Sequence, residues 1–256
     1  MNVFFLVPSI DEQHVYAKIK ELTALRVPYL IVSGKRINKP HVVYREPRGK
    51  YDAINFGSKF IPKNVDVVVL NDVDTKIQNF ESALKTLYSE NAALLFGRVV
   101  VEKGPQQSFY PLLDFIRRRV LVSASGELML IRKDAFDAVI PIKRCKAEDS
   151  YILFKVLELK GKAVFCEVCY VETRRTVSAE KEEEYKRKTV CGIYQALAVT
   201  KPHALIRLFY FLLPLLAPLL LVSGRKGYFW TRGIFLGLAD YLRGDQSGTW
   251  LSTYMN

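Results

Sequence analysis

The sequence reads Val67-Val-Val-Leu-Asn-Asp-Val-Asp-Thr75 at the point that decides its fold. Its opening apolar run predicts a strand covered on both faces, as in a parallel sheet between helices. Asp72 and Asp74 follow at once, and their spacing lets two carboxylate oxygens converge on one hard cation. Two aspartates with this spacing on an arbitrary surface would usually lie in a solvated turn. The position of Asp72 and Asp74 at the end of a predicted strand is what favours a metal site.

Short apolar runs alternate with amphipathic stretches through residues 1–172. The runs that predict strands are Val3–Val7, Tyr29–Ser33, Val42–Tyr44 and Val65–Leu70. Helical patterns between them cover Glu12–Leu25, Lys50–Phe60 and Phe80–Ser89. This alternation predicts an α/β domain with a mainly parallel sheet flanked by helices. Because ligands of such sheets bind outside the carboxyl ends of the strands, the segments after Val7, Ser33 and Leu70 should form the mouth of the site.

Composition narrows the function classes. The 256 residues fit one large domain, or one domain plus an appendage, and a hydrophobic content of 50% excludes global disorder. A net charge of +12 suits nucleic acid, anionic lipid or a diphosphate substrate. Since the aromatic residues sit mostly inside apolar runs, a stacking platform for nucleic acid is not expected. A basic peripheral-membrane or nucleic-acid-binding module remains the non-enzymatic alternative.

The cysteines and the N-terminus point to the cytoplasm. Four cysteines are too few for a disulfide scaffold, and Cys166 and Cys169 stand in the apolar run Ala163–Val171, which predicts thiols on a buried strand. The apolar segment Asn2–Pro8 is too short for a signal peptide and lacks its basic region. The soluble part is therefore expected on the cytoplasmic side of a cell membrane.

The C-terminal part carries a membrane signal. Leu208–Val222 holds no charge and is interrupted by Pro214 and Pro218, and Tyr228–Leu242 mixes aromatic, basic and acidic residues. A spanning helix needs about 20 apolar residues, and basic residues on both flanks oppose a single pass. A re-entrant or interfacial hairpin is the favoured interpretation. A single span, and a core helix or oligomer contact of a soluble protein, are the alternatives.

Two further motifs carry candidate chemistry. In Arg45-Glu-Pro-Arg-Gly-Lys-Tyr-Asp-Ala-Ile-Asn-Phe-Gly57, small residues would let a helix approach a nucleotide while basic ones meet its phosphates. A basic helix start after a turn explains the motif equally well. Glu148 and Asp149 precede the apolar helix Tyr151–Leu159. Acidic residues favour a helix N-terminus electrostatically, but a base for an acceptor hydroxyl would stand in the same place.

Taken in order, these motifs resemble those of glycosyltransferase family 2, whose catalytic domain has the GT-A fold. The resemblance covers roughly residues 1–195 and leaves residues 196–256 as a C-terminal membrane-associated helical hairpin. It is carried by Phe4-Phe-Leu-Val-Pro-Ser-Ile-Asp-Glu12, Gly49-Lys50 with Asn55 and Gly57, Asp72-Val-Asp74, Ser125-Gly-Glu-Leu-Met-Leu-Ile-Arg132 and Glu148-Asp149.

The resemblance implies a role for each motif. Asp72 and Asp74 would hold Mg²⁺ or Mn²⁺ against the diphosphate of a nucleotide-sugar donor. Asp149, beside Glu148, would take the proton of an acceptor hydroxyl, with inversion at the anomeric carbon. The donor pocket would be formed by Pro8, Glu12, Lys50, Asn55 and Asp72, with Arg187 or Lys188 at the diphosphate.

Two departures from the family pattern limit what it implies. The family often has an acidic run after the second strand, but here the sequence is Val32-Ser-Gly-Lys35, so the nucleotide base is left open. Tyr185-Lys-Arg-Lys-Thr189 lacks the Gln and Trp of processive polymer synthases. Transfer of one or a few sugars is therefore expected.

The acceptor stays open at this stage. A lipid-linked saccharide or glycolipid offers a hydroxyl, for which Asp149 is useful, whereas a polyprenyl phosphate is already ionised and needs no base. A sugar-phosphate nucleotidyltransferase is the alternative of another enzyme class. It would carry a Gly-rich basic signature after the first strand, which Pro8-Ser-Ile-Asp-Glu12 does not show. The sequence leaves the sugar and the oligomeric state undecided.

Overall fold

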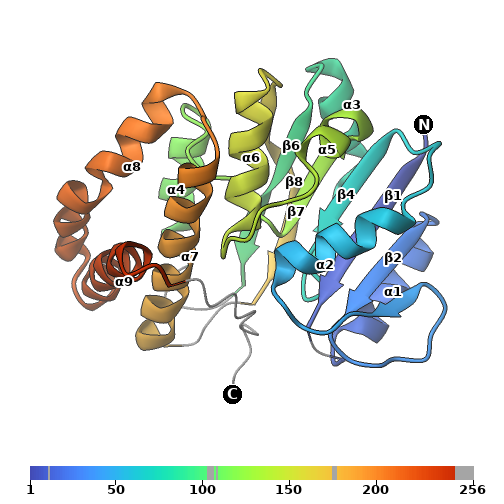
Figure 1. Cartoon of the computed structure of the whole chain (residues 1–256), viewed down its shortest axis with the longest axis horizontal. Coiled ribbons are helices and arrows are strands. Elements are labelled where there is room, and N and C mark those ends of the chain that lie inside the picture. The colour runs from blue at the N-terminus through green and yellow to red at the C-terminus, as the bar shows by residue number, and fades with distance from the viewer. Residues whose placement is uncertain (11, 103–106, 108, 175–177, 246–256) are drawn as a thin grey trace.

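A single eight-stranded sheet forms the centre of the molecule (Figure 1). The computed structural model describes residues 1–10, 12–102, 107, 109–174 and 178–245. The strand order is β3-β2-β1-β4-β7-β6-β8-β5. The bounds of the strands are β1 Val3–Ser9, β2 Tyr29–Ser33, β3 Val42–Tyr44, β4 Val67–Asn71, β5 Lys76–Gln78, β6 Leu94–Val101, β7 Leu128–Arg132 and β8 Ala163–Thr173.

The sheet is mainly parallel, as the sequence predicts. β1 pairs in parallel with β2 and β4, β2 with β3, and β6 with β8. β7 runs antiparallel between β4 and β6, and β5 runs antiparallel to β8. The reversal of β7 was not predicted, because its fully apolar start, Leu128–Ile131, is buried whichever way the strand runs.

Helices cover both faces of the sheet and enclose a core on each. One face carries α1 (Val15–Ala24), α3 (Phe80–Ser89) and α4 (Tyr110–Arg117). The other carries α2 (Lys50–Gly57) with the short 3₁₀ turn η1 (Ser58–Phe60), α5 (Lys133–Val139) and α6 (Glu148–Glu158). Strand β1 shows why both cores form: Phe4 and Leu6 enter one, and Phe5 and Val7 enter the other. The buried free cysteines Cys166 and Cys169 lie on β8, as predicted.

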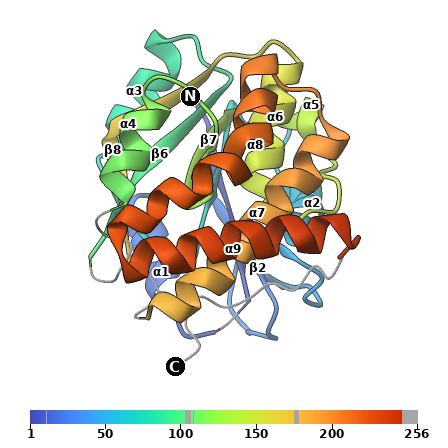
Figure 2. The same ribbon diagram turned by 90° about the vertical axis from the view of Figure 1, so that its left-hand side faces the viewer.

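The C-terminal helices pack at one end of the sheet, with α8 and α9 on the outside (Figures 1 and 2). Their bounds are α7 Ala179–Val199, α8 Ala204–Leu216, η3 Ala217–Ser223 (a 3₁₀ helix) and α9 Arg225–Leu242. Helix α9 lies close against α7 because Gly237 has no side chain; a Cβ there would stand 2.5 Å from the carbonyl oxygen of Arg187. The expected division between residues 195 and 196 falls within α7, and residues 246–256 of the expected hairpin lie outside the described residues.

One described segment, Ala204–Ser223, is long and apolar enough by composition to cross a membrane. It comprises α8 and η3, and most of it is exposed at the surface of the protein. Length and composition make this segment a candidate for membrane association.

Candidate active site

The turn that carries Asp72 and Asp74 stands at the carboxyl end of β4 and is held by hydrogen bonds. The side-chain Nδ2 of Asn71 donates to Thr75 Oγ1 at 2.9 Å and to the Glu127 carbonyl at 2.6 Å. Thr75 Oγ1 donates to the Asp72 carbonyl at 2.9 Å. The two carboxylates therefore leave the sheet edge on a braced backbone, at the place where ligands of α/β sheets bind.

A buried lysine supports this turn from below. Lys18 of α1 is 1% exposed, and its Nζ donates to Asn71 Oδ1 at 2.7 Å and to the Thr75 carbonyl at 2.5 Å. The same Nζ lies 2.6 Å from Glu21 Oε2. Burial lowers the pKa of Lys18, and the charge of Glu21 opposes that shift. The partners of the ammonium explain how a charged side chain is kept in the core.

Lys50 joins the Asp72 turn to the start of α6. Its Nζ lies 2.7 Å from Asp72 Oδ1 and 2.7 Å from Glu148 Oε1, and it donates to the Gly126 carbonyl at 3.4 Å. Burial acts to lower the pKa of Lys50, but the charges of the two carboxylates outweigh it and raise the pKa above its ordinary value. The side chain is therefore a fixed cation between two predicted site residues.

Asp149 follows Glu148 in the first turn of α6. One of its oxygens accepts a hydrogen bond from the Ser150 backbone N–H at 2.7 Å. Burial and the charge of Glu148 raise the pKa of Asp149 to about 6, against the opposing charge of Lys50. A carboxylate with this pKa is ionised at neutral pH and can still accept a proton, as a general base must.

Gly126, two residues before β7, closes the site on a further side. A Cβ at this position would lie 3.1 Å from Asp149 Cβ and 3.2 Å from Lys50 Nζ. These approaches are tighter than most real Cβ contacts, so the absence of a side chain lets the two charged residues stand side by side.

Helix α7 brings one of its two predicted residues to this cluster. Burial lowers the pKa of Lys188, while the charges of Glu148 and Asp72 act to raise it, so its ammonium lies within electrostatic reach of both. Arg187 is bound elsewhere: its guanidinium donates to both carboxylate oxygens of Asp240 on α9, at 2.5 and 2.8 Å.

The other predicted donor residues have local partners. Pro8 is buried near the carboxyl end of β1. The exposed Glu12 accepts a hydrogen bond from the Tyr16 hydroxyl at 3.1 Å. The side chain of Asn55 donates to the Ile142 carbonyl and accepts from the Ile142 N–H, both at 2.8 Å, which ties α2 to the segment after α5.

The carboxylates at the carboxyl end of β4 suit a hard cation that the substrate also binds. Asp72 and Asp74 supply carboxylate oxygens, the ligands that Mg²⁺ and Mn²⁺ prefer. Within the part of the chain that the structure describes, no three His, Cys, Asp or Glu side chains group to hold a metal by themselves. The residues fit a metal completed by phosphate oxygens and water, and they do not form a closed protein site.

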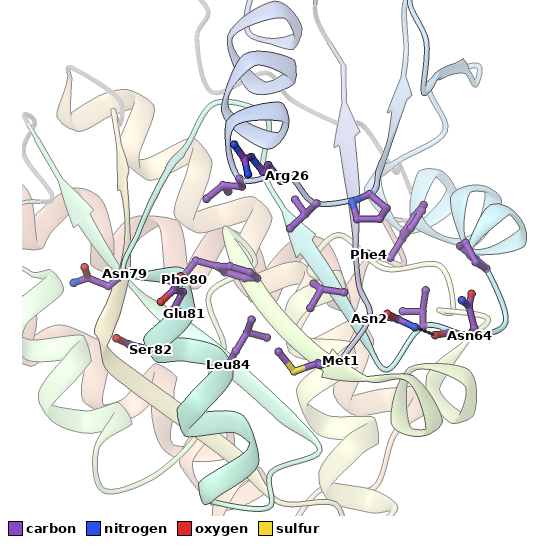
Figure 3. A pocket seen from close by; sticks show the side chains of 16 residues that line it. Met1, Asn2, Phe4, Arg26, Asn64, Asn79, Phe80, Glu81, Ser82 and Leu84 are labelled. Atoms are coloured by element: carbon purple, nitrogen blue, oxygen red, sulfur yellow. Dashed lines mark hydrogen bonds between the residues drawn. The ribbon is translucent and has the colours of Figure 1, made fainter.

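A large cavity lies at the opposite edge of the sheet (Figure 3). It has a volume of about 900 Å³ and is lined by residues at the starts of β1 and β4, among them Asn2, Phe4 and Asn64, and by Phe80 and Leu84 of α3. The charged cluster around Lys50 stands at the other ends of these strands. The candidate chemistry is therefore separate from this cavity.

Two residues near the site were missed in the sequence. Lys18 had a signal, because it shares one face of α1 with the buried Val15 and Leu22, and a lysine on an apolar face needs a partner. Tyr210 of α8 had none, since it stands within an apolar run. It is 3% exposed, its hydroxyl donates to the Val122 carbonyl at 2.7 Å, and after burial the charge of Asp149 contributes to raising its pKa.

Comparison by sequence finds no relative. No protein-family model matches the chain, and no curated protein matches it.

Solved structures share the fold at low sequence identity. The mannosyltransferase PcManGT from Pyrobaculum calidifontis, in complex with GDP-Man and Mn²⁺, superposes with a TM-score of 0.70 at 14% identity, over 95% of this chain and 88% of that one. GalNAc-T7 with UDP, GalNAc and Mn²⁺ has a TM-score of 0.57 at 12% identity, over 95% and 57%. S. aureus TarS 1–349 has a TM-score of 0.55 at 13% identity, over 96% and 92%. The chain thus has the fold of the GT-A glycosyltransferases.

Proposed function

We propose that the chain is a metal-dependent, inverting glycosyltransferase that moves a sugar from a nucleoside-diphosphate donor to a hydroxyl of a lipid-linked acceptor. One observation carries the proposal: Lys50 contacts both Asp72 and Glu148 at 2.7 Å, with Asp149 the next residue of α6. A leaving-group site and a base site thus share one sheet edge. The GT-A fold supports this interpretation, because the compared structures are glycosyltransferases.

The leaving group would meet the cationic side of the site. Asp72 and Asp74 would hold Mg²⁺ or Mn²⁺, which offsets the negative charge that develops on the departing diphosphate. Lys50 and Lys188 add fixed positive charge near the same place. We assign Arg187 to the contact between α7 and α9, because both oxygens of Asp240 already bind its guanidinium.

The acceptor would meet Asp149. Its carboxylate takes the hydroxyl proton while the acceptor oxygen attacks the anomeric carbon from the face opposite the leaving group. The bond from that carbon to the diphosphate oxygen breaks, and the configuration inverts. The pKa of about 6 favours this role over simple helix capping, since an ordinary carboxylate is a weaker base. Pro8, Glu12 and Asn55 remain predictions for the donor pocket.

The C-terminal part supports a membrane location and a lipid-linked acceptor. The exposed apolar segment Ala204–Ser223 would bring the catalytic domain to the cytoplasmic face of a cell membrane. A lipid-linked saccharide or glycolipid would then supply the hydroxyl. A polyprenyl phosphate is the second candidate acceptor, because it would use the same membrane location without a base.

The deciding experiment compares acceptors and a base variant. The chain is assayed with a panel of sugar nucleotides and Mn²⁺, and labelled sugar is followed into lipids that present either a hydroxyl or a phosphate. Asp149→Asn should abolish transfer to the hydroxyl and only weaken transfer to the phosphate, while the exposed Asp134→Asn should change neither. Unchanged activity of Asp149→Asn on every acceptor would remove Asp149 from the mechanism. Pyrophosphate release from a nucleoside triphosphate and a sugar phosphate would point instead to a nucleotidyltransferase.

A further inference from the structure

The outer side of α8 and η3 is a continuous apolar stripe. Its exposed side chains recur every three or four residues, which places them on one side of a helix. They are Leu205, Leu208, Phe211, Leu215, Leu219 and Val222. Their exposed fractions lie between 52% for Leu208 and 91% for Val222. An exposed apolar surface of this extent marks an interaction site.

The inner side of the same segment is hydrogen-bonded to the rest of the protein, and Figure 2 shows α8 and α9 on the outside of the molecule. The hydroxyl of Tyr210 donates to the Val122 carbonyl at 2.7 Å, and the hydroxyl of Tyr194 donates to the Tyr210 carbonyl at 2.7 Å. Thr231 Oγ1 of α9 donates to the Ala217 carbonyl at 2.8 Å. A helix that crossed a bilayer would have to leave these partners, so the segment lies along the surface of the domain.

The exposed charges on the helices that carry the stripe, and on α9, have one sign. On α8, η3 and α9 the exposed charged residues are all basic: Arg207, Arg225, Lys226 and Arg232. The one acidic residue of these elements, Asp240, is buried against Arg187. Glu180 and Glu183 of α7 pair with Arg225 and Arg232, at 2.5 and 3.3 Å. Arg207 and Lys226 thus add to a basic border along the stripe.

Helix α4 extends this surface. Leu112 and Phe115 are each 49% exposed, and the guanidinium of Arg119 lies 3.7 Å from the centre of the Phe115 ring. A groove of about 530 Å³ between α4 and the start of α9 is lined by Phe109, Leu112, Ser223, Arg225 and Lys226. Apolar walls beside Lys226, with Arg225 held next to it by Glu180, match a phospholipid, whose acyl chains and phosphate require both an apolar surface and a cation.

We propose that this surface, formed by α4, α8, η3 and the start of α9, docks in the plane of an anionic lipid bilayer. The apolar stripe enters the boundary of the acyl chains, and the basic side chains stand at the level of the phosphates. A second copy of the chain is a poorer partner, because a two-fold contact would set Arg207 and Lys226 of one copy against the same residues of the other.

The docking surface also explains how a lipid-linked acceptor would reach the site, a point that rests on the proposed function. Tyr210 projects from the inner side of α8, and its ring centroid lies 6.1 Å from that of Phe154 on α6, the helix that begins with Glu148 and Asp149. The stripe on the outer side would hold the same helix on the membrane. The candidate base thus lies behind the docked helix, close to the bilayer.

Vesicle sedimentation of the full chain tests this proposal. We expect binding to vesicles of phosphatidylcholine with phosphatidylglycerol, weaker binding to phosphatidylcholine alone, and release at high salt. Phe211→Ser/Leu215→Ser should weaken the partition coefficient on the order of tenfold or more. Arg207→Gln/Lys226→Gln should remove the preference for the anionic vesicles. The matched control Tyr88→Ser/Val168→Ser removes two exposed apolar side chains from α3 and β8 and should bind like the parent chain.

Three results would overturn the docking surface. One is equal vesicle binding by Phe211→Ser/Leu215→Ser. Another is retention of the parent chain in cell membranes after an alkaline wash, which indicates a span. The third is a parent chain that forms a dimer and binds no vesicles, while Phe211→Ser/Leu215→Ser is a monomer. Hydrolysis of the sugar nucleotide in solution is measured in parallel: its absence alongside normal vesicle binding would count against the proposed function alone.

Discussion

Asp149 is a residue whose ionisation opposes folding. Burial and Glu148 raise its pKa to about 6 in the folded chain, above about 3.9 for an unfolded aspartate. The destabilisation is therefore absent below about pH 4, grows as the pH rises through about 6, and is complete above it. We expect Asp149→Asn to raise the free energy of unfolding by about 1–2 kcal/mol at neutral pH, a value discounted for partial exposure, and to leave it unchanged near pH 4. Urea denaturation at both pH values checks this, and a loss of stability at neutral pH would contradict it.

The same pKa predicts the pH dependence of transfer. A base must be ionised before it accepts a proton, so kcat/KM should fall tenfold for each pH unit below about 6. A cation bound at Asp72 would add positive charge nearby and shift this limb to lower pH. A pH profile with saturating Mn²⁺ and a hydroxyl acceptor measures the limb. This acidic limb should be missing from the pH profile of whatever activity Asp149→Asn retains. A profile of the parent chain that stays flat down to pH 4 would exclude a base of this pKa.

Lys18 predicts a coupling between the core and the metal site. Lys18→Met removes the cation that bonds Asn71 Oδ1 and the Thr75 carbonyl, and it leaves Glu21 without this partner. Loss of one member of a buried charge pair should cost roughly 3 kcal/mol of folding free energy. We also expect weaker Mn²⁺ activation, because the turn that carries Asp72 and Asp74 loses its brace. The exposed Lys20→Met on the same helix is the control, and an equal effect of both variants would refute a specific role for Lys18.

Among the elements, the contact between α6 and α7 decides where the candidate base stands. Gly192 of α7 lies so close to α6 that a Cβ would come within 2.4 Å of the Ala147 backbone nitrogen. Ala147 directly precedes Glu148 and Asp149, so any separation of the helices moves both carboxylates. We expect Gly192→Ala to lower the free energy of unfolding by about 1–3 kcal/mol. We also expect it to reduce kcat more than it changes KM. The exposed Ala198→Val on the same helix should do neither, and normal kcat in a folded Gly192→Ala would mean that the site tolerates the shift.

The elements also show what sequence patterns can and cannot predict. Strands β2 and β3 and helix α3 have the bounds that their apolar patterns predict, because period and burial act within a few residues. Strand direction is a property of the whole chain path, and the reversal of β7 left no local mark. Asp72, Asp74, Glu148 and Asp149 were predicted because each follows a recognisable strand or stands at the start of a recognisable helix. The diversion of Arg187 to Asp240 depends on a residue 53 positions further along the chain and was not predictable.

At the scale of the molecule, the C-terminal helices are part of the same folded body as the sheet. Ile206 and Tyr210 of α8 belong to the core that α2 and α6 form on the sheet. Arg187 and Lys146 pair with Asp240 and Asp245 at the C-terminal end. A division of function near residue 195 is therefore compatible with a single unit of folding.

Because the C-terminal helices share a core with the sheet, we expect one cooperative unfolding transition, and the tryptophans allow a direct test. Both lie in the C-terminal part, Trp230 in α9 and Trp250 beyond the described residues. In a Trp250→Phe chain, fluorescence reports on Trp230, which stacks on Phe109 next to α4, whereas far-ultraviolet circular dichroism reports on the whole fold. We expect the two urea transitions to coincide, and a chain ending at residue 203 to aggregate because the core residues from α8 are gone. If Trp230 fluorescence changed at lower urea while most of the dichroism persisted, the C-terminal helices would form an independent unit on a separately stable domain.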